Sequence, residues 1–156
     1  GPAADPARVK GLSIIEALTR LAQGKGTFIS RGDDSGTHKK ELELWEKAGI
    51  KPQGQWYKAV GKGMADTLIM TNELAAYTLT DRGTYASMKN RLKLEALVFG
   101  DAALFNPYGV IAVNPERHPE VNYQGAMAFI EFITSAEAKK IINGYKVNGE
   151  QLFIAE

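Results

Sequence analysis

The segment from Ser30 to Thr37, Ser-Arg-Gly-Asp-Asp-Ser-Gly-Thr, combines the residue types that bind an oxyanion. Arg31 is a permanent cation whose guanidinium can donate two parallel hydrogen bonds to two oxygens of one ligand. Ser35 and Thr37 add hydroxyl donors, and Gly36 leaves the backbone open to close approach. Because an oxyanion needs several converging donors, these residue types predict an anion-binding site.

The two acidic residues of this segment need a structural role, because a carboxylate repels an anion. Asp33 and Asp34 are compatible with a site only if one caps the following helix and the other, as a buttress, holds Arg31 in place. A purely structural interpretation stays open. In that interpretation Asp34 or Ser35 does no more than cap the helix, and Arg31 does no more than pair with Asp33.

The elements around this segment would place it at the edge of a sheet. Residues 27–30 are typical of a short strand, and a helix is expected from about Ser35 to Ala48, ended by Gly49 and Pro52. Free backbone N–H groups and the positive end of the helix dipole then point outward from the carboxyl edge of the sheet. Ligands of open α/β folds bind at such edges.

A second glycine-rich helix start, Gly61-Lys62-Gly63-Met64, follows a weak strand over residues 56–60. It adds Gly63 as a further candidate contact, and a helix is expected from there to about Leu74. Neither start is a P-loop, because the pattern Gly-x-x-x-x-Gly-Lys-Ser/Thr does not occur.

The rest of the chain also alternates helices with strands. Further helices are expected over residues 13–23 with a capping box of Ser13 and Glu16, from Asp81 to about 90, and from 122 or 123 to 144 with a second capping box of Thr134 and Glu137. Further strands are expected over residues 77–80, 94–99 and 108–113, the last continuously apolar and so covered on both faces. This alternation predicts an α/β fold with a mixed or parallel sheet flanked by helices.

Composition excludes several functional classes. The 156 residues are 44% hydrophobic, carry a formal net charge of +1, and include no cysteine and two histidines. Disulfides, thiolate zinc sites and cysteine nucleophiles are excluded, and the neutral charge argues against a nucleic-acid partner. No apolar run approaches the roughly 18 residues of a membrane span. No catalytic motif occurs, although Ser35 and His38 lie one helical turn apart.

Two long runs of this sequence resemble one protein family. They are Ser-Arg-Gly-Asp-Asp-Ser-Gly-Thr-His-Lys-Lys-Glu at 30–41 and Ala-Tyr-Thr-Leu-Thr-Asp-Arg-Gly-Thr-Tyr at 76–85. With Val-Ile-Ala-Val-Asn-Pro at 110–115, they resemble the tungstate-binding solute receptors of bacterial ABC importers. The resemblance implies a type II periplasmic-binding-protein fold, in which a hinge joins two α/β lobes that hold an oxyanion between them.

The resemblance also implies roles for residues and segments. Arg31 resembles the family's ligand-contacting arginine, and Ser35, Gly36 and Thr37 match its donors at the helix start. Residues 1–7 correspond to a hinge segment and 8–104 to a second lobe that carries half of the anion site. Residues 105–156 correspond to a return strand and C-terminal helices that belong to the first lobe, which is largely missing. The unpartnered apolar residues of these helices, such as Phe129, Ile133 and Ile141, predict that the chain self-associates.

The expected function is periplasmic or otherwise extracytoplasmic binding of tungstate, or of molybdate, for delivery to an ABC permease. No enzymatic activity, cofactor, nucleic-acid partner or stable membrane insertion is expected, and any signal peptide would lie upstream of this chain. The alternative is an oxyanion-sensing effector domain of a regulator with the same fold. An upstream signal peptide would favour the receptor, and an upstream helix-turn-helix the regulator. A third alternative is an enzyme built on Ser35 and His38.

Overall fold

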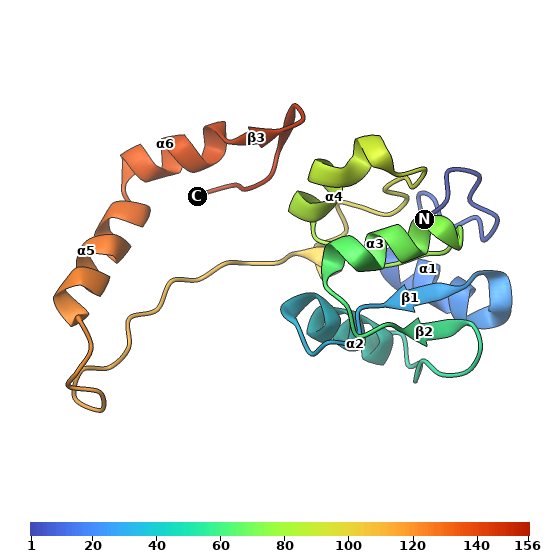
Figure 1. Cartoon of the computed structure of the whole chain (residues 1–156), viewed down its shortest axis with the longest axis horizontal. Helices are drawn as coiled ribbons and strands as arrows, with labels where there is room; N and C mark the ends of the chain where they lie inside the picture. Colours follow the sequence, from blue (N-terminus) through green and yellow to red (C-terminus); the bar gives the residue numbers. More distant parts are fainter. The chain divides into compact units, whose positions relative to one another are not determined.

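The computed structural model describes all 156 residues, which form two compact units (Figure 1). The first unit is Gly1–Phe105 and the second is Asn106–Glu156. Each unit is described below by itself. None of the helices combines the length and the apolar character needed to cross a membrane.

The first unit alternates short strands with helices, which confirms the predicted mixed α/β fold. Its helices and strands are α1 (Ile14–Arg20), continued by a π-helical turn η1 (Leu21–Lys25), then β1 (Phe28–Ser30), α2 (Gly36–Lys47), β2 (Tyr57–Ala59), α3 (Met64–Glu73) and α4 (Arg82–Met88). Two 3-10 turns follow, η2 (Lys89–Arg91) and η3 (Ala102–Leu104). The capping box of Ser13 and Glu16 opens α1 as expected, and Asp81 caps α4.

The sheet of this unit is small and parallel. β1 pairs with β2 in the register Phe28↔Tyr57, and on its other edge Phe28 forms a parallel bridge with Tyr77. The strand expected over residues 77–80 is reduced to this bridge, because the Thr78 side chain, rather than a backbone amide, makes the next hydrogen bond to β1. Its hydroxyl donates to the Ile29 carbonyl at 2.7 Å. The three parallel segments therefore share one carboxyl edge, from which α2, α3 and α4 begin.

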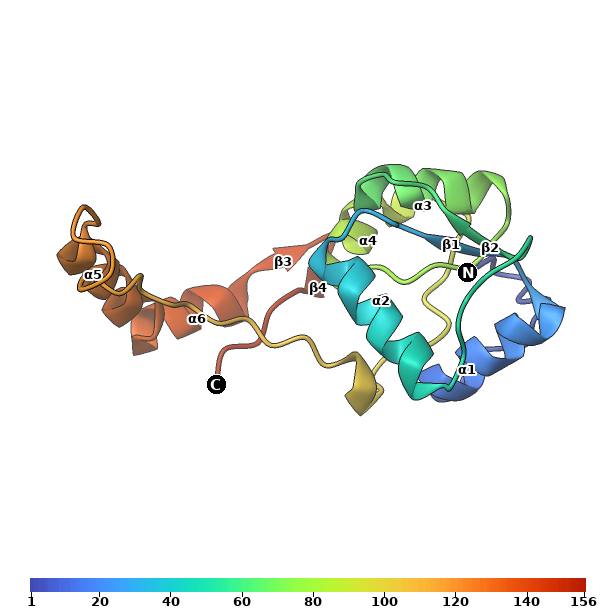
Figure 2. The same ribbon diagram turned by 90° about the horizontal axis from the view of Figure 1, so that it is seen from below.

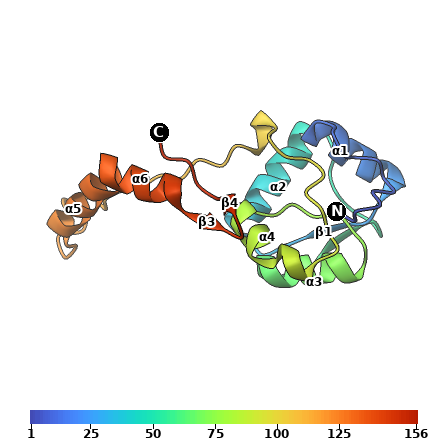
Figure 3. The same ribbon diagram turned by 90° about the horizontal axis from the view of Figure 1, so that it is seen from above.

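Helices cover both faces of this sheet. α3 lies on one face, and α1 and α2 lie on the other (Figures 2 and 3). Between the sheet and α2 an aromatic cluster forms from Phe28, Trp45, Trp56 and Tyr57. The ring centroids of Phe28 and Trp45 are 5.2 Å apart, and those of Trp45 and Trp56 are 5.5 Å apart. These aromatic residues form part of the packed core rather than an exposed stacking platform.

The strand expected over residues 94–99 is wrong. Only Leu94 bridges, in antiparallel fashion, to Pro2, and the Glu95 amide donates to the Gly1 carbonyl at 2.8 Å. A proline partner has no N–H to extend such a ladder. The N-terminal segment is held instead by Tyr77, whose hydroxyl accepts from the Ala7 amide at 2.9 Å and donates to Asp5 at 3.0 Å.

The second unit contains two helices and a short hairpin: α5 (Tyr123–Ile133), α6 (Ala136–Gly144), β3 (Lys146–Val147) and β4 (Glu150–Gln151). The predicted capping box of Thr134 and Glu137 is wrong by one residue. Ser135 caps α6 by accepting from the Ala138 amide at 3.2 Å, while the Thr134 hydroxyl donates back to Ile130 at the end of α5. Adjacent Thr and Ser residues offer the same chemistry, so sequence alone could not choose between them.

The strand expected over residues 108–113 is also wrong. This segment is irregular, and Ile111 is 89% exposed. Its apolar character matches a strand covered on both faces, yet a strand also needs neighbours that share its backbone hydrogen bonds. No strand of the second unit pairs with it.

Candidate functional site

The predicted anion segment lies at the carboxyl edge of the parallel sheet, between β1 and α2. We call residues Arg31–Ser35 the anion turn. Two backbone hydrogen bonds tie the end of β1 and the anion turn to the loop after β2: the Val60 amide donates to the Ser30 carbonyl at 3.0 Å, and the Lys62 amide donates to the Arg31 carbonyl at 3.2 Å. The second glycine-rich helix start, with Gly63 as N-cap of α3, therefore lies at the same edge of the sheet.

Gly32 allows the anion turn to pack directly on the end of β2. Its φ is +61°, in the left-handed region, and a Cβ at this position would lie 2.8 Å from the Cβ of Ala59. Both the conformation and the contact require glycine. The turn therefore cannot move away from β2 without losing its close packing.

Arg31 and Asp33 form the predicted pair. Arg31 donates from Nη2 at 2.5 Å and from Nε at 3.2 Å to Oδ2 of Asp33. Oδ1 of Asp33 accepts from the Ser35 amide at 3.3 Å. Hydrogen bonding by the Ser35 side chain, followed by that of Arg31, lowers the pKa of Asp33 to about 2 against an opposing desolvation effect. Asp33 is thus ionised at neutral pH, and Nη1 of Arg31 has no acceptor within the chain.

Ser35, and not Asp34, caps α2. The Ser35 backbone is extended and its hydroxyl accepts from the His38 amide at 3.3 Å, as an N-cap requires. Asp34 has a φ of +59°, which does not suit a cap, and its exposed side chain lies 3.6 Å from the Lys39 ammonium. The Asp34 amide donates instead to Nδ1 of His38 at 3.0 Å.

These contacts leave a defined set of donors at the start of α2. The Ser35 and His38 amides are used within the turn, whereas the Gly36 and Thr37 amides have no protein acceptor. The Thr37 hydroxyl also has none. A Cβ at Gly36 would meet no atom within 4 Å, so the space above these amides is open. With Nη1 of Arg31 available nearby in sequence, this arrangement can accept an anion that needs donors.

Sequence reasoning missed Glu41, a buried residue of α2 that anchors the helix behind this turn. The residue is 3% exposed, and its Oε1 accepts from Trp45 Nε1 at 3.1 Å and from the Tyr57 hydroxyl at 2.7 Å. Burial raises the pKa of Glu41, and the neighbouring Ser30, Tyr57 and Trp45 side chains partly offset that rise. Burial, together with Glu41, raises the pKa of Tyr57 to about 12. The available signal was an acidic residue on the inward face of α2, one turn before Trp45.

The structure does not support an enzyme built on Ser35 and His38. The His38 imidazole accepts from the Asp34 amide, and the contact between His38 and Ser35 runs through the His38 backbone. A general base must reach the hydroxyl proton of its nucleophile. No group of three or more His, Asp or Glu side chains is placed to hold a metal ion.

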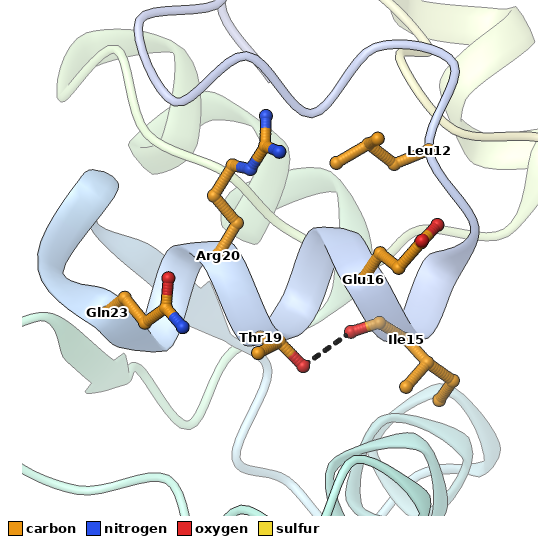
Figure 4. Close-up of a pocket in the computed structure, with 6 residues that line it drawn as sticks. All are labelled: Leu12, Ile15, Glu16, Thr19, Arg20 and Gln23. Atoms are coloured by element: carbon orange, nitrogen blue, oxygen red, sulfur yellow. Dashed lines mark hydrogen bonds between the residues drawn. The ribbon is translucent and has the colours of Figure 1, made fainter.

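A shallow groove on α1 is not a competing site. It is lined by Leu12, Ile15, Glu16, Thr19, Arg20 and Gln23 (Figure 4). The Thr19 hydroxyl donates to the Ile15 carbonyl at 2.8 Å, Glu16 accepts from Ser13, and Arg20 donates to the Arg8 carbonyl. Because the Glu16, Thr19 and Arg20 side chains are already paired within the chain, the groove offers few free groups to a ligand.

Comparison with known proteins agrees with this architecture. Residues 1–137 match the PBP superfamily domain. The chain is 50% identical over 159 residues to a putative ABC transporter anion-binding protein of Haloferax volcanii, covering 98% of this chain and 46% of that protein. It is 51% identical over 148 residues to the tungstate-binding protein TupA of Peptoclostridium acidaminophilum, covering 93% of this chain and 52% of that protein.

A solved structure is similar as well. The tungstate-binding protein TupA of Desulfovibrio alaskensis matches with a TM-score of 0.85 and 42% identity, covering 100% of this chain and 65% of that one. The chain therefore spans about half the length of the two relatives above and about two thirds of this structure.

Proposed function

The chain belongs to the PBP superfamily, and from this premise we propose that it binds tungstate as part of an ABC importer. The names of its relatives support an oxyanion ligand and an ABC transporter, since they are called tungstate-binding or anion-binding. Its similarity to each of them extends over more than nine tenths of this chain. The names also favour the importer over the regulator that the fold alone allows.

The start of α2 carries this proposal. Tungstate is an unprotonated dianion near neutral pH, so it needs hydrogen-bond donors and no acceptor. The Gly36 and Thr37 amides, the Thr37 hydroxyl and Nη1 of Arg31 are donors without a protein partner. The helix dipole adds a positive potential at the same place. Ser35 and Asp33 act by shaping the turn, and Gly63 is a further contact from the loop before α3.

The proposal extends to molybdate, which has the same charge, tetrahedral shape and nearly the same size. The donors at the start of α2 would serve either anion. We further propose that binding occurs outside the cytoplasm, that an ABC permease receives the anion, and that no chemistry is performed on it. No cofactor is needed for such a cycle of binding and release.

The assignment of segments to lobes is part of the proposal. Residues 1–7 serve as a hinge segment, 8–104 as the second lobe and 105–156 as the return into the first lobe. In this arrangement the anion turn supplies one wall of the site. The relatives are about twice as long as this chain, and in the full-length proteins the second wall would come from the remaining part.

Titration of the ¹⁵N-labelled chain with sodium tungstate at pH 7 tests the proposal. Amide resonances report weak binding residue by residue, so half a site is enough to give a signal. We expect saturable shifts of the Gly36 and Thr37 amide resonances with tungstate. Sodium chloride at equal ionic strength should not shift these resonances. Shifts spread over the lysine residues without saturation, or none at all, would contradict the proposal.

A further inference from the structure

We propose that His38 is a positioning residue of the anion site. Its imidazole accepts a hydrogen bond from the Asp34 amide and so fixes which amides of the turn remain free for a ligand. The inference rests on the proposed function for its ligand, but the contact itself can be tested without any ligand. His38 does not touch the anion in this proposal. It acts through the backbone of residues 34 and 35.

The contact with Asp34 is the first observation. Asp34 has a φ of +59°, in the left-handed region that Asn and Asp adopt more readily than other L-residues. Its amide donates to Nδ1 of His38 at 3.0 Å. A nitrogen that accepts a hydrogen bond carries no proton, so the neutral ring must carry its proton on Nε2. The imidazole is thus the acceptor for the amide of this left-handed residue.

The backbone of His38 makes the second contact. Its amide donates to the hydroxyl of the N-cap Ser35 at 3.3 Å. One residue therefore holds position 34 with its side chain and position 35 with its main chain. The Asp34 amide is turned toward His38 as a result, and the free backbone donors are those of Gly36 and Thr37.

The face of α2 that carries His38 is anchored to the sheet. Ser35, His38, Glu41 and Trp45 follow each other at spacings of three, three and four, so they share one helical face. Glu41 accepts a hydrogen bond from the Tyr57 hydroxyl of β2 at 2.7 Å. His38 thus lies on the same helical face as the buried Glu41 and holds the left-handed Asp34 at the start of that face. Without an acceptor at this position, Asp34 would relax and carry the neighbouring Asp33 and Arg31 with it.

The tautomer of His38 provides the first test. Long-range ¹H–¹⁵N spectra of the imidazole in the chain at neutral pH distinguish the two neutral forms. We expect an unprotonated Nδ1 and a protonated Nε2, with the Asp34 amide shifted downfield by its hydrogen bond. A proton on Nδ1 would overturn the proposal, because the Asp34 amide would then have no acceptor there.

Two matched variants provide the second test. The Oδ1 of asparagine lies close to where Nδ1 of histidine lies, so His38→Asn keeps the acceptor, whereas His38→Leu keeps similar bulk without it. We expect tungstate to bind at least about tenfold more weakly to His38→Leu, the effect of one lost hydrogen bond. His38→Asn should stay within about threefold of the unaltered chain. Equal affinities of the two variants would overturn the proposal.

The two tests separate failure of this inference from failure of the proposed function. If tungstate does not bind the unaltered chain, the ligand is wrong, and the tautomer still decides whether His38 holds Asp34. Thermal unfolding of both variants provides the folding control. A merely structural role would lower the stability of His38→Leu without the rescue of tungstate affinity by asparagine.

Discussion

The Arg31–Asp33 pair determines how the proposed site recognises charge. Because Asp33 is ionised and bonded to Arg31, the two side chains together bring little net charge to the turn. Recognition must then come from directed hydrogen bonds and the helix dipole rather than from a bare cation. The Nε edge of Arg31 is occupied by Asp33, so a ligand would meet the outer edge of the guanidinium through Nη1 and Nη2.

Replacing Arg31 tests this view of the site. Loss of a charge-assisted contact from a half-buried position should cost about 2–5 kcal/mol of binding free energy. Arg31→Ala should therefore weaken tungstate binding by at least about thirtyfold, measured by the same amide titration, while unfolding remains cooperative. Arg91→Ala, which removes an exposed arginine elsewhere in the first unit, serves as the control. Unchanged affinity of Arg31→Ala would remove it from the site.

The carboxylates of the turn predict selectivity against phosphate. Near neutral pH phosphate carries a proton and gains from an acceptor. Both oxygens of Asp33 are already used by Arg31 and Ser35, and Asp34 lies beside Lys39. Tungstate should therefore bind at least about a hundredfold more tightly than phosphate, a difference of about 2.7 kcal/mol. A competition titration in which phosphate displaces tungstate at comparable concentration would show that a carboxylate faces the ligand.

Glu41 predicts how stability depends on pH. Its raised pKa means that the folded chain holds this proton more tightly than the unfolded chain. The stabilisation is complete below the ordinary pKa of 4.5 and is lost as the pH rises through the folded value. Glu41→Gln keeps an acceptor for Trp45 and Tyr57 without a charge, so its unfolding free energy should not fall over that range. Urea titrations from pH 4 to 8 check this, and parallel profiles for the two proteins would refute it.

At the scale of elements, local signals predicted more than long-range pairing. The capping residues Ser13, Ser35 and Asp81 begin their helices as expected, because a cap depends only on residues within one turn. The strands predicted over 94–99 and 108–113 are wrong, because an apolar run does not indicate which strand it would pair with. The candidate site divides in the same way. The pairing of Arg31 with Asp33 follows from their spacing, whereas the contacts of Glu41 and His38 depend on how α2 packs.

The start of α2 predicts opposite effects on stability and binding. A Cβ at Gly36 would meet no protein atom, and alanine favours a helix more than glycine does. Gly36→Ala should therefore leave the unfolding free energy unchanged or raise it by up to about 1 kcal/mol. The same methyl group would occupy the space above the Gly36 and Thr37 amides and weaken tungstate binding at least about tenfold. Denaturation and titration of one preparation measure both effects, and unimpaired binding would place the anion elsewhere.

At the scale of the whole molecule, the second unit exposes more apolar surface than its two helices can cover. Its exposed large hydrophobic residues are Tyr108, Val110, Ile111, Val113, Tyr123, Met127, Phe129, Phe132, Ile141, Tyr145, Phe153 and Ile154. A soluble chain rarely leaves such a surface in contact with water. The chain covers about half the length of these relatives, and we expect the remaining part of such a protein to cover this surface.

This surface leads us to expect self-association of the isolated chain. Exchange of the segment after Pro107 between two copies is one route that would bury these residues. Light scattering at high micromolar concentration should give a mass above 17.0 kDa, and the double substitution Phe129→Ser with Ile141→Ser should lower it. A stable monomer without added detergent would contradict the prediction.

The aromatic cluster behind the anion turn also gives the protein an optical signature. The indoles of Trp45 and Trp56 are the only two in the chain, their centroids lie 5.5 Å apart, and their planes meet at 65°. Two chromophores held so close at such an angle couple their electronic transitions, which produces a paired circular-dichroism band of opposite signs. That band depends on the packing of α2, which carries Trp45, against the segment before β2, which carries Trp56. The circular-dichroism spectrum of unlabelled protein therefore reports whether the packing beneath the anion turn is intact.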